Sequence, residues 1–141
     1  MSQLLESHFP RLDAFRPASL PVSERPLAIR GGLAPWQMRR LRSYIDENLV
    51  LPLTTRELAQ LVRLSTSHFC RSFKVSFGFT VHHFVMARRI EKAQKRILKG
   101  SEDLSQIAIL CGLCDQAHLT HWFKRVVGET PGRWRRSHSP E

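Results

Sequence analysis

Two short stretches of this sequence place hydrogen-bonding and basic side chains at the spacing of a helix face. In the first stretch, Arg71 can donate two hydrogen bonds to the O6 and N7 atoms of guanine, and in the second, Gln116 can pair with adenine. Ser67, Thr120 and the nearby histidines can bond either bases or phosphates. Three basic residues further along suit phosphate oxygens: Lys74, Lys124 and Arg125. These residue types suit contacts in the major groove of DNA.

The two stretches are copies of one pattern, because the sequence overlays on itself when it is shifted by fifty residues, from 68 to 118. The pattern is His68-Phe69-x-x-x-Phe73-Lys74-x-x-x-Gly78-x-Thr80 in the first copy and His118-Leu119-x-x-x-Phe123-Lys124-x-x-x-Gly128-x-Thr130 in the second. It extends forwards, with Phe84 against Trp134, and backwards, with Leu58-Ala59 against Ile107-Ala108, where the offset is forty-nine because the copies differ by one residue before Asp115. A repeat of this kind predicts a matched pair of small helical units.

The elements before the first stretch are predicted as two helices. Pro35 suits the first turn of a helix, which ends before Pro52. Its apolar stripe has spacings of three and four: Met38, Leu41, Ile45 and Leu49. The pattern Thr54-x-x-Glu57 is a capping box, and it predicts a second, short helix.

The first stretch itself is predicted as a third helix. Leu64-Ser65 turns the chain, and Ser65 can cap the helix that follows. Phe69 and Phe73 define the buried side of a helical wheel drawn from 67 to 76. The opposite side carries Ser67, Arg71 and Lys74, flanked by His68 and Cys70.

The second copy repeats this plan. Asp103-x-x-Gln106 is its capping box, Cys111-Gly112-Leu113 its turn, and Asp115 the cap of its second helix. The buried side of that helix carries Leu119, Phe123, Val126 and Val127. The exposed side carries Ala117, His121 and Lys124, flanked by His118 and Arg125.

Between the copies, residues 81–98 predict one continuous bridging helix. Its apolar residues have spacings of four, three and four: Met86, Ile90, Ala93 and Ile97. Eighteen residues at about 1.5 Å each span roughly 27 Å, which approaches one turn of duplex DNA. Gly100 ends this helix, and Pro131 and Trp134 belong to a short last helix. The predicted fold class is therefore all-α, with two helix-turn-helix subdomains joined by a long bridging helix, about seven helices in total.

The predicted domain organisation follows from these elements. Residues 1–34 contain four prolines with little periodicity and are predicted as a flexible tail or linker. The first helix-turn-helix unit spans 35–80, the bridging helix 81–99 and the second unit 100–138.

Composition and charge restrict the function classes. The chain has 141 residues and a formal net charge of +10, and residues 1–29 are balanced, so the whole excess lies in 30–141. A compact basic protein of this size favours nucleic acid or an anionic surface as its partner. No apolar run approaches the roughly 18 residues of a membrane span, and the N-terminus has no secretory pattern. The chain has three cysteines, and an odd number without an export signal fits a reducing compartment. These features predict a cytoplasmic protein without membrane contact.

Cysteine and histidine in the second copy raise the alternative of a zinc site. Cys111-x-x-Cys114 is followed by His118 and His121, but zinc motifs that chelate from separate elements leave roughly a dozen residues between the pairs. We favour buried packing for Cys111 and turn geometry for Cys114, with no metal and no cofactor. Redox sensing through Cys70 is an alternative to an exposed thiol without function.

The sequence has no glycine-rich phosphate loop and no paired carboxylates on one helix face, so we predict no enzyme.

Two further groups of residues each have two interpretations. The basic pairs of the bridging helix suit either phosphate contacts or a solvated face: Arg88-Arg89 and Lys95-Arg96. Three aromatic residues favour core or staple positions over stacking platforms: Trp36, Phe84 and Trp134.

The two copies resemble the AraC/XylS family of transcription regulators over about 36–136. The motifs that carry the resemblance are Ser65-x-Ser67-His68-Phe69-x-Arg71-x-Phe73-Lys74 and Gly112-x-x-Asp115-Gln116-Ala117-His118-Leu119-x-x-x-Phe123-Lys124-Arg125-x-x-Gly128-x-Thr130-Pro131. The resemblance implies a sequence-specific transcriptional regulator, and an activator, whose two reading helices lie in adjacent major grooves of promoter DNA. The partners that it implies are double-stranded promoter DNA and RNA polymerase. The protein is expected to bind the DNA as a monomer.

The resemblance also implies a set of base-reading residues, which are Ser67, Cys70 and Arg71 in the first unit and Gln116, Ala117, His118, Thr120 and His121 in the second. Cys70 and Ala117 form weak hydrogen bonds at best, so we expect apolar readout there, for instance of a thymine methyl. Arg63 stands where the first turn of the family usually has glycine. If that site needs a positive φ, the arginine costs on the order of 1 kcal/mol.

Two other functions fit a basic helical protein. An architectural protein that bends DNA is disfavoured, because wedge residues for a minor groove are missing. A module that captures polymerase or another regulator is favoured only as a companion role, because both copies carry basic faces. The family often adds a sensor domain, so the chain is either a regulator without its own ligand pocket or the DNA-binding part of a longer one.

Overall fold

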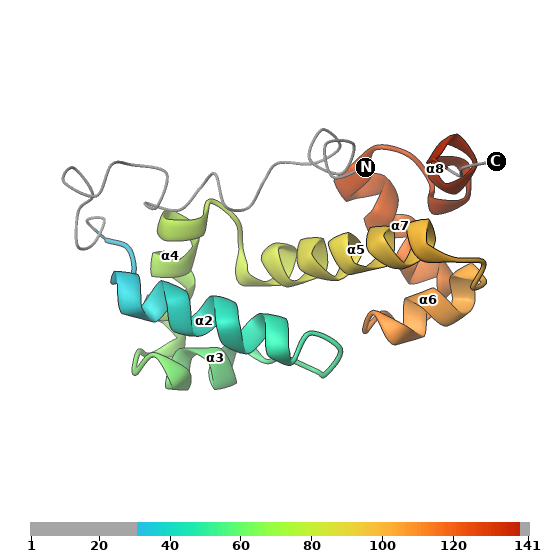
Figure 1. Cartoon of the computed structure of the whole chain (residues 1–141). Helices are drawn as coiled ribbons and strands as arrows, with labels where there is room; N and C mark the ends of the chain where they lie inside the picture. The colour runs from blue at the N-terminus through green and yellow to red at the C-terminus, as the bar shows by residue number, and fades with distance from the viewer. Residues whose placement is uncertain (1–30, 139–141) are drawn as a thin grey trace. The chain divides into compact units, whose positions relative to one another are not determined.

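The computed structural model describes residues 31–138. Residues 1–30 and 139–141 lie outside the described residues, and with them most of the predicted tail at 1–34. Within the described range the chain forms seven helices and no strand, which confirms the predicted all-α class (Figure 1). The helices are α2 Pro35–Glu47, α3 Thr55–Leu61, α4 Thr66–Phe77, α5 Val81–Lys99, α6 Leu104–Leu110, α7 Gln116–Val127 and α8 Pro131–His138.

Two compact units share these helices. Of the described residues, the N-terminal unit contains 31–48 and 52–85, and the C-terminal unit contains 49–51 and 86–138. The predicted bridging helix, α5, is continuous, and its residues are divided between the two units after Val85. Each unit contains one helix-turn-helix pair, α3 with α4 in the first and α6 with α7 in the second.

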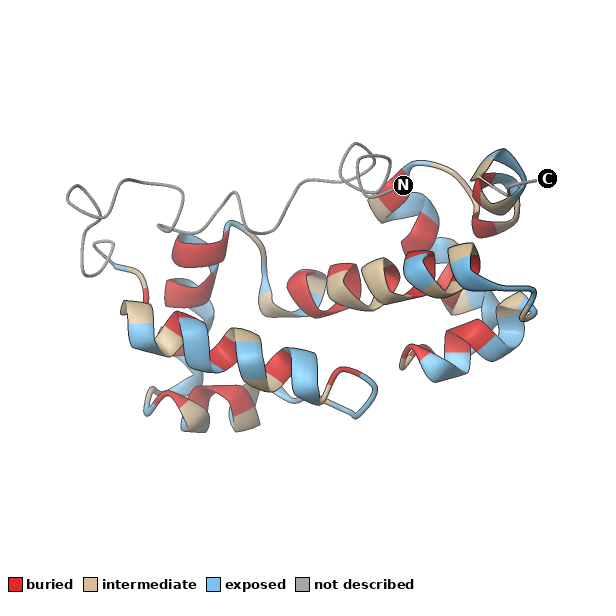
Figure 2. Ribbon diagram, in the orientation of Figure 1, coloured by how far each residue is buried: buried red, intermediate tan, exposed pale blue. Residues whose placement is uncertain are grey.

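Phenylalanines of α4 form the core of the N-terminal unit. Phe73 stacks on Phe77 with ring centroids 4.3 Å apart, and Phe69 lies 5.6 Å from Phe73. Phe84, from the first turn of α5, packs edge-on against Phe73 and Phe77. Burying one such ring contributes about 1.5–3 kcal/mol. The cluster therefore fixes the inner side of α4 and leaves its polar side at the surface (Figure 2).

Polar bonds join α2 to α3 in the same unit. The Tyr44 hydroxyl donates to the Glu57 carboxylate, and Gln37 Nε2 donates to the Val62 carbonyl at 3.0 Å. The bond with Glu57 raises the pKa of Tyr44. Thr54 Oγ1 accepts from the Glu57 N–H at 3.1 Å, as predicted for the cap of α3. The capping-box prediction is wrong in its second half, because the Glu57 carboxylate bonds Tyr44 instead of the cap residue.

The core of the C-terminal unit is built as the apolar spacing predicts. α5 supplies Met86, Ile90, Ala93 and Ile97, and these pack with residues of the three following helices: Ile107, Ala108, Leu119, Trp122, Phe123, Val127 and Trp134. Phe123 and Trp134 meet with ring centroids 5.6 Å apart. This single cluster ties the second helix-turn-helix pair to α5 and α8.

Two of the three aromatic residues predicted at core or staple positions lie in the core, and the third does not. Phe84 and Trp134 are core residues, each at most 1% exposed. Trp36 is 46% exposed, because the apolar stripe of α2 runs through Met38, Leu41 and Ile45 on another side of the helix. None of the helices formed by residues 31–138 combines the length and apolar character that crossing a bilayer requires.

Candidate nucleic-acid interface

The turns of the two helix-turn-helix pairs have the same backbone path. Arg63 has φ of 62° and Gly112 has φ of 87°, both in the left-handed region. The residue after each of them donates its N–H back into the preceding helix, Leu64 to the Ala59 carbonyl and Leu113 to the Ala108 carbonyl, at 3.0 and 2.9 Å. The position of Arg63 therefore does require a positive φ, and a side chain there costs about 1 kcal/mol.

The predicted caps fix the first turn of both predicted reading helices. Ser65 Oγ accepts from the His68 N–H at 3.2 Å, and the Asp115 carboxylate accepts from the His118 N–H at 2.8 Å. Each helix ends at a glycine with left-handed backbone, α4 at Gly78 and α7 at Gly128. Capping at both ends keeps the full length of each helix ordered without help from a bound ligand.

The predicted reading face of α4 lies at the surface. Phe69 and Phe73 are fully buried on the opposite side. The exposed residues of this helix include every candidate of the first unit: Ser67, Cys70, Arg71 and Lys74. A groove-sized surface of short and basic side chains is thus available on α4.

Most residues of the predicted reading face of α7 are also exposed, and two are half-buried. The exposed candidates are Gln116, Ala117, His121, Lys124 and Arg125. His118 and Thr120 are half-buried, nearer to the edge of the helix that packs on the core. Trp122 is 8% exposed, and its place in the core was missed from the sequence although it follows Leu119 by three residues.

His118 is held by the turn that precedes α7. Its Nδ1 accepts the Cys114 N–H at 3.1 Å. A neutral imidazole that accepts at Nδ1 carries its proton on Nε2, so the free edge of the His118 ring can only donate. This bond orients the ring and leaves Nε2–H as a donor, which suits an acceptor such as a phosphate oxygen, guanine N7 or thymine O4.

Aromatic contacts orient two other candidates on α7. The Arg125 guanidinium lies over the Trp122 ring at 5.3 Å from its centroid, within cation–π range. His121 meets the same ring edge-to-face at 5.8 Å. Trp122 is buried in the core, so both exposed side chains contact an anchored ring.

Most of the basic residues of α5 have partners within the protein. Arg88 pairs with Glu91 at 2.7 Å, and Arg96 forms two bonds with Glu102 at 2.8 and 3.0 Å. Arg89 donates to two backbone carbonyls, and burial lowers its pKa. Three of the four basic side chains therefore have partners within the protein, and Lys95 is exposed.

The cysteines of the second unit separate in burial. Cys111 is fully buried in the core, as predicted, and burial raises the pKa of its thiol. Cys114 is exposed beside the turn. Across residues 31–138, no group of three or more His, Cys, Asp or Glu side chains is placed to hold a metal ion.

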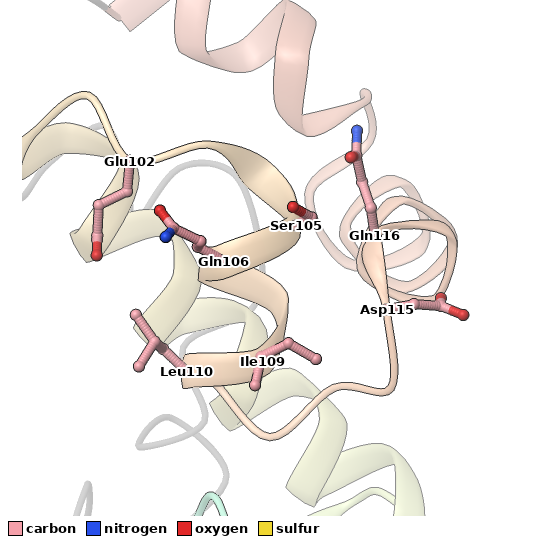
Figure 3. A pocket seen from close by; sticks show the side chains of 7 residues that line it. All are labelled: Glu102, Ser105, Gln106, Ile109, Leu110, Asp115 and Gln116. Atoms are coloured by element: carbon pink, nitrogen blue, oxygen red, sulfur yellow. The ribbon is translucent and has the colours of Figure 1, made fainter.

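An open hollow of about 480 Å³ lies beside α6 and the start of α7 (Figure 3). Ile109 and Leu110 extend from the last turn of α6 at its edge, and they are 60% and 43% exposed. Asp115 and Gln116 line it from the start of α7. This surface was not predicted from the sequence, although two adjacent apolar residues stand there where the first copy has Gln60 and Leu61.

Two helix-turn-helix pairs with capped second helices and exposed polar faces define a DNA-binding type of all-α protein. A family model described as a helix-turn-helix domain matches residues 58–137, more than half of the chain. Solved structures with the same fold include one titled an AraC-type DNA-binding domain. The chain belongs to this helix-turn-helix family of AraC/XylS type, as its motifs predict.

Two curated relatives match most of the described residues. The chain is 33% identical over 92 residues to the probable transcriptional regulator LumQ of Photobacterium leiognathi, a match that covers 65% of this chain and 37% of LumQ. It is 30% identical over 95 residues to AdaA of Bacillus subtilis, named a bifunctional transcriptional activator/DNA repair enzyme, covering 67% of this chain and 45% of AdaA. The chain thus spans less than half the length of these relatives.

Solved structures share the fold at low sequence identity. The DNA-binding domain of AdpA, solved in complex with a target DNA, matches with a TM-score of 0.67 and 20% identity, over 72% of this chain and 92% of that one. A regulator with an AraC-type domain from Chromobacterium violaceum matches with a TM-score of 0.68 and 22% identity, over 74% and 93%.

Proposed function

We propose that this protein is a sequence-specific DNA-binding transcriptional regulator that places α4 and α7 in adjacent major grooves of promoter DNA. The observation that carries the proposal is the duplicated reading face: two capped helices, each anchored by buried aromatic or aliphatic residues and each polar on its exposed side. Because both faces belong to one chain and differ in sequence, the protein binds as a monomer to a site without twofold symmetry.

We propose base-reading roles for the candidates that the sequence predicts. In the N-terminal unit, Arg71 reads a guanine, and Ser67 and Cys70 lie beside it on the same exposed face. In the C-terminal unit, Gln116 reads an adenine, and the remaining readers are Ala117, His118, Thr120 and His121. The phosphate contacts come from Lys74, Lys124 and Arg125.

Selection of bound sequences from a random duplex library tests this proposal. The expected result is enrichment of two unlike half-sites about 10 base pairs apart. Arg71→Ala should erase enrichment at one position of one half-site, and Gln116→Ala at one position of the other. Binding without any enriched sequence would contradict the proposal and favour an architectural role.

We propose RNA polymerase as the protein partner and activation as the outcome. The observation that favours a protein partner is the pair of exposed apolar residues on α6, Ile109 and Leu110. Replacing both with serine should leave DNA affinity unchanged and lower transcription from a bound promoter in a purified system. An unchanged transcript level would remove α6 as the contact.

We propose further that the chain is not an enzyme and that it acts in the cytoplasm. The name of AdaA includes a repair activity, but this chain spans 45% of AdaA, and the family match at 58–137 is a helix-turn-helix domain. The proposed ligand, promoter DNA, lies in the cytoplasm of bacteria such as those that supply the relatives. Assay of the purified chain for repair of alkylated DNA tests the first point, and no turnover is expected.

A further inference from the structure

A short segment between α2 and α3 belongs to one unit, whereas the residues before and after it in the sequence belong to the other. Residues 49–51 group with the C-terminal unit, whereas 31–48 and 52–85 group with the N-terminal unit. Within the described residues, the chain therefore passes between the units after Asn48, after Leu51 and after Val85. α5 is one covalent connection between the units, and segment 49–51 is a second.

One side chain of α5 holds this segment. Arg89 Nε donates to the Leu49 carbonyl at 2.8 Å, and Arg89 Nη2 donates to the Leu51 carbonyl at 2.9 Å. The planar guanidinium can bond two carbonyls of one segment at once, which the single ammonium of a lysine cannot do with the same geometry. The Leu49 side chain is 8% exposed, so the segment is anchored by burial as well as by these bonds.

The turn of the second helix-turn-helix pair meets the same segment. A Cβ atom added at Gly112 would lie 3.0 Å from the Leu49 carbonyl oxygen and 3.1 Å from Arg89 Nε. At Gly128, which also has a positive φ, nothing lies within 4 Å of such an atom. Gly112 is thus required for close approach and not only for its φ, and segment 49–51 rests directly against the turn that leads into α7.

We propose that Arg89 is a positioning residue, which fixes segment 49–51 on the turn of the second helix-turn-helix pair and so sets the half-site spacing that the two reading helices accept. The inference rests on the proposed function. Segment 49–51 follows the end of α2 at Glu47 and precedes the start of α3 at Thr55. Because α3 is the first helix of the other pair, loosening the segment from Arg89 loosens the connection between the two reading helices.

The rival role for Arg89 is a phosphate contact. Two of its nitrogens already donate to carbonyls, and Nη1 lies 3.9 Å from Met86 Sδ. A phosphate role predicts that loss of Arg89 weakens binding to every duplex and lowers the salt slope by about one unit. A positioning role predicts an effect only where both half-sites must be engaged together.

The test compares Arg89→Gln with Arg88→Gln, a neighbouring change of equal charge that removes the ion pair with Glu91. Affinity is measured for the selected site, for each half-site alone, and for sites lengthened by one and two base pairs. We expect Arg89→Gln to weaken the selected site about tenfold, because the two charge-assisted hydrogen bonds to the segment are lost. Half-site affinity should be unchanged, and the penalty for altered spacing should shrink. Arg88→Gln should keep the wild-type spacing profile.

Arg89→Lys and a measurement without DNA complete the test. The lysine keeps the charge and the aliphatic stem, so a stably folded Arg89→Lys protein with the relaxed spacing profile supports the need for two bonds. Hydrogen exchange of the amides at 49–51 should accelerate in both Arg89 variants while those of α7 do not. Equal weakening on all duplexes, or an unchanged spacing profile together with unchanged exchange, would overturn the proposal. If wild type selects no paired half-sites, the proposed function fails, and exchange at 49–51 still decides whether Arg89 holds the segment.

Discussion

Arg63 and Gly112 occupy the same place in the two turns, and both have a left-handed backbone, at φ of 62° and 87°. Only the second turn excludes a side chain, because a Cβ at Gly112 would lie 3.0 Å from Val50 Cα and from the Leu49 carbonyl oxygen. Arg63 is exposed, so its cost is confined to its backbone conformation. The duplicated units therefore differ in what fixes their turns.

Arg63→Gly should stabilise the N-terminal unit. Glycine adopts a positive φ without steric cost, and we expect the free energy of unfolding to rise by about 0.5–1 kcal/mol. Urea titration followed by circular dichroism measures the change. Gly112→Ala is the opposite control and should destabilise the protein by more, since steric overlap adds to the φ strain. A less stable Arg63→Gly protein would show that the arginine side chain makes contacts that outweigh its backbone cost.

Arg71→Ala should weaken specific binding and relax preference at one base pair. A bidentate contact to guanine is worth about 1–3 kcal/mol of discrimination, and random DNA should lose little. Lys74→Ala, three residues along the same exposed face, is the matched control. It should weaken both duplexes alike and lower the salt slope by about one unit. Equal loss of both duplexes with Arg71→Ala would place Arg71 among the phosphate contacts.

Ser65→Ala and Ser67→Ala should separate folding from recognition. Ser65 caps α4 by accepting the His68 N–H at 3.2 Å, and its loss should cost about 1 kcal/mol of unfolding free energy. Ser67 is exposed in the first turn of the same helix, and its loss should change stability by less than about 0.5 kcal/mol. Thermal melts and binding titrations of both variants give the comparison. The reverse order of stabilities would show that the cap of α4 is assigned to the wrong serine.

Asp103 should contribute to stability in a way that depends on pH. The Gln106 N–H and then the Ser105 side chain donate to its carboxylate, and both bonds lower its pKa. A carboxylate with a lowered pKa stabilises the fold above its unfolded pKa, and this contribution is lost as the pH falls below about 4. Asp103→Asn should therefore show a shallower loss of stability between about pH 5 and 2. Glu47→Gln, an exposed acid on α2, is the control, and an equally shallow curve for it would contradict the assignment.

The duplication made much of this fold predictable from the sequence. Caps and apolar spacing are local signals, so Ser65 and Asp115 cap the helices that the repeat predicts, and Phe84 is buried. These signals report on residues a few positions apart, and a repeat doubles each of them.

Such local signals do not predict which individual side chains and carbonyls contact one another. Arg89 bonds carbonyls 38 and 40 residues earlier, and backbone carbonyls leave no trace in residue types. The bond from the Cys114 N–H to His118 and the cation–π contact of Arg125 with Trp122 depend on rotamers, which spacing alone does not specify. The exposure of Trp36 was missed because a large aromatic residue near an apolar stripe resembles a member of it.

The central claim is that α4 and α7 read one duplex together, and its most direct test is the affinity of the selected site after insertion of five base pairs between the half-sites. Such an insertion rotates one half-site by roughly half a helical turn. We expect the affinity to fall nearly to that of a single half-site. A ten-pair insertion adds distance but returns both half-sites to one face of the duplex, so the affinity difference between the two insertions measures the effect of rotation. Unchanged affinity after the five-pair insertion would contradict the account, because it would mean that only one of the two helices reads DNA.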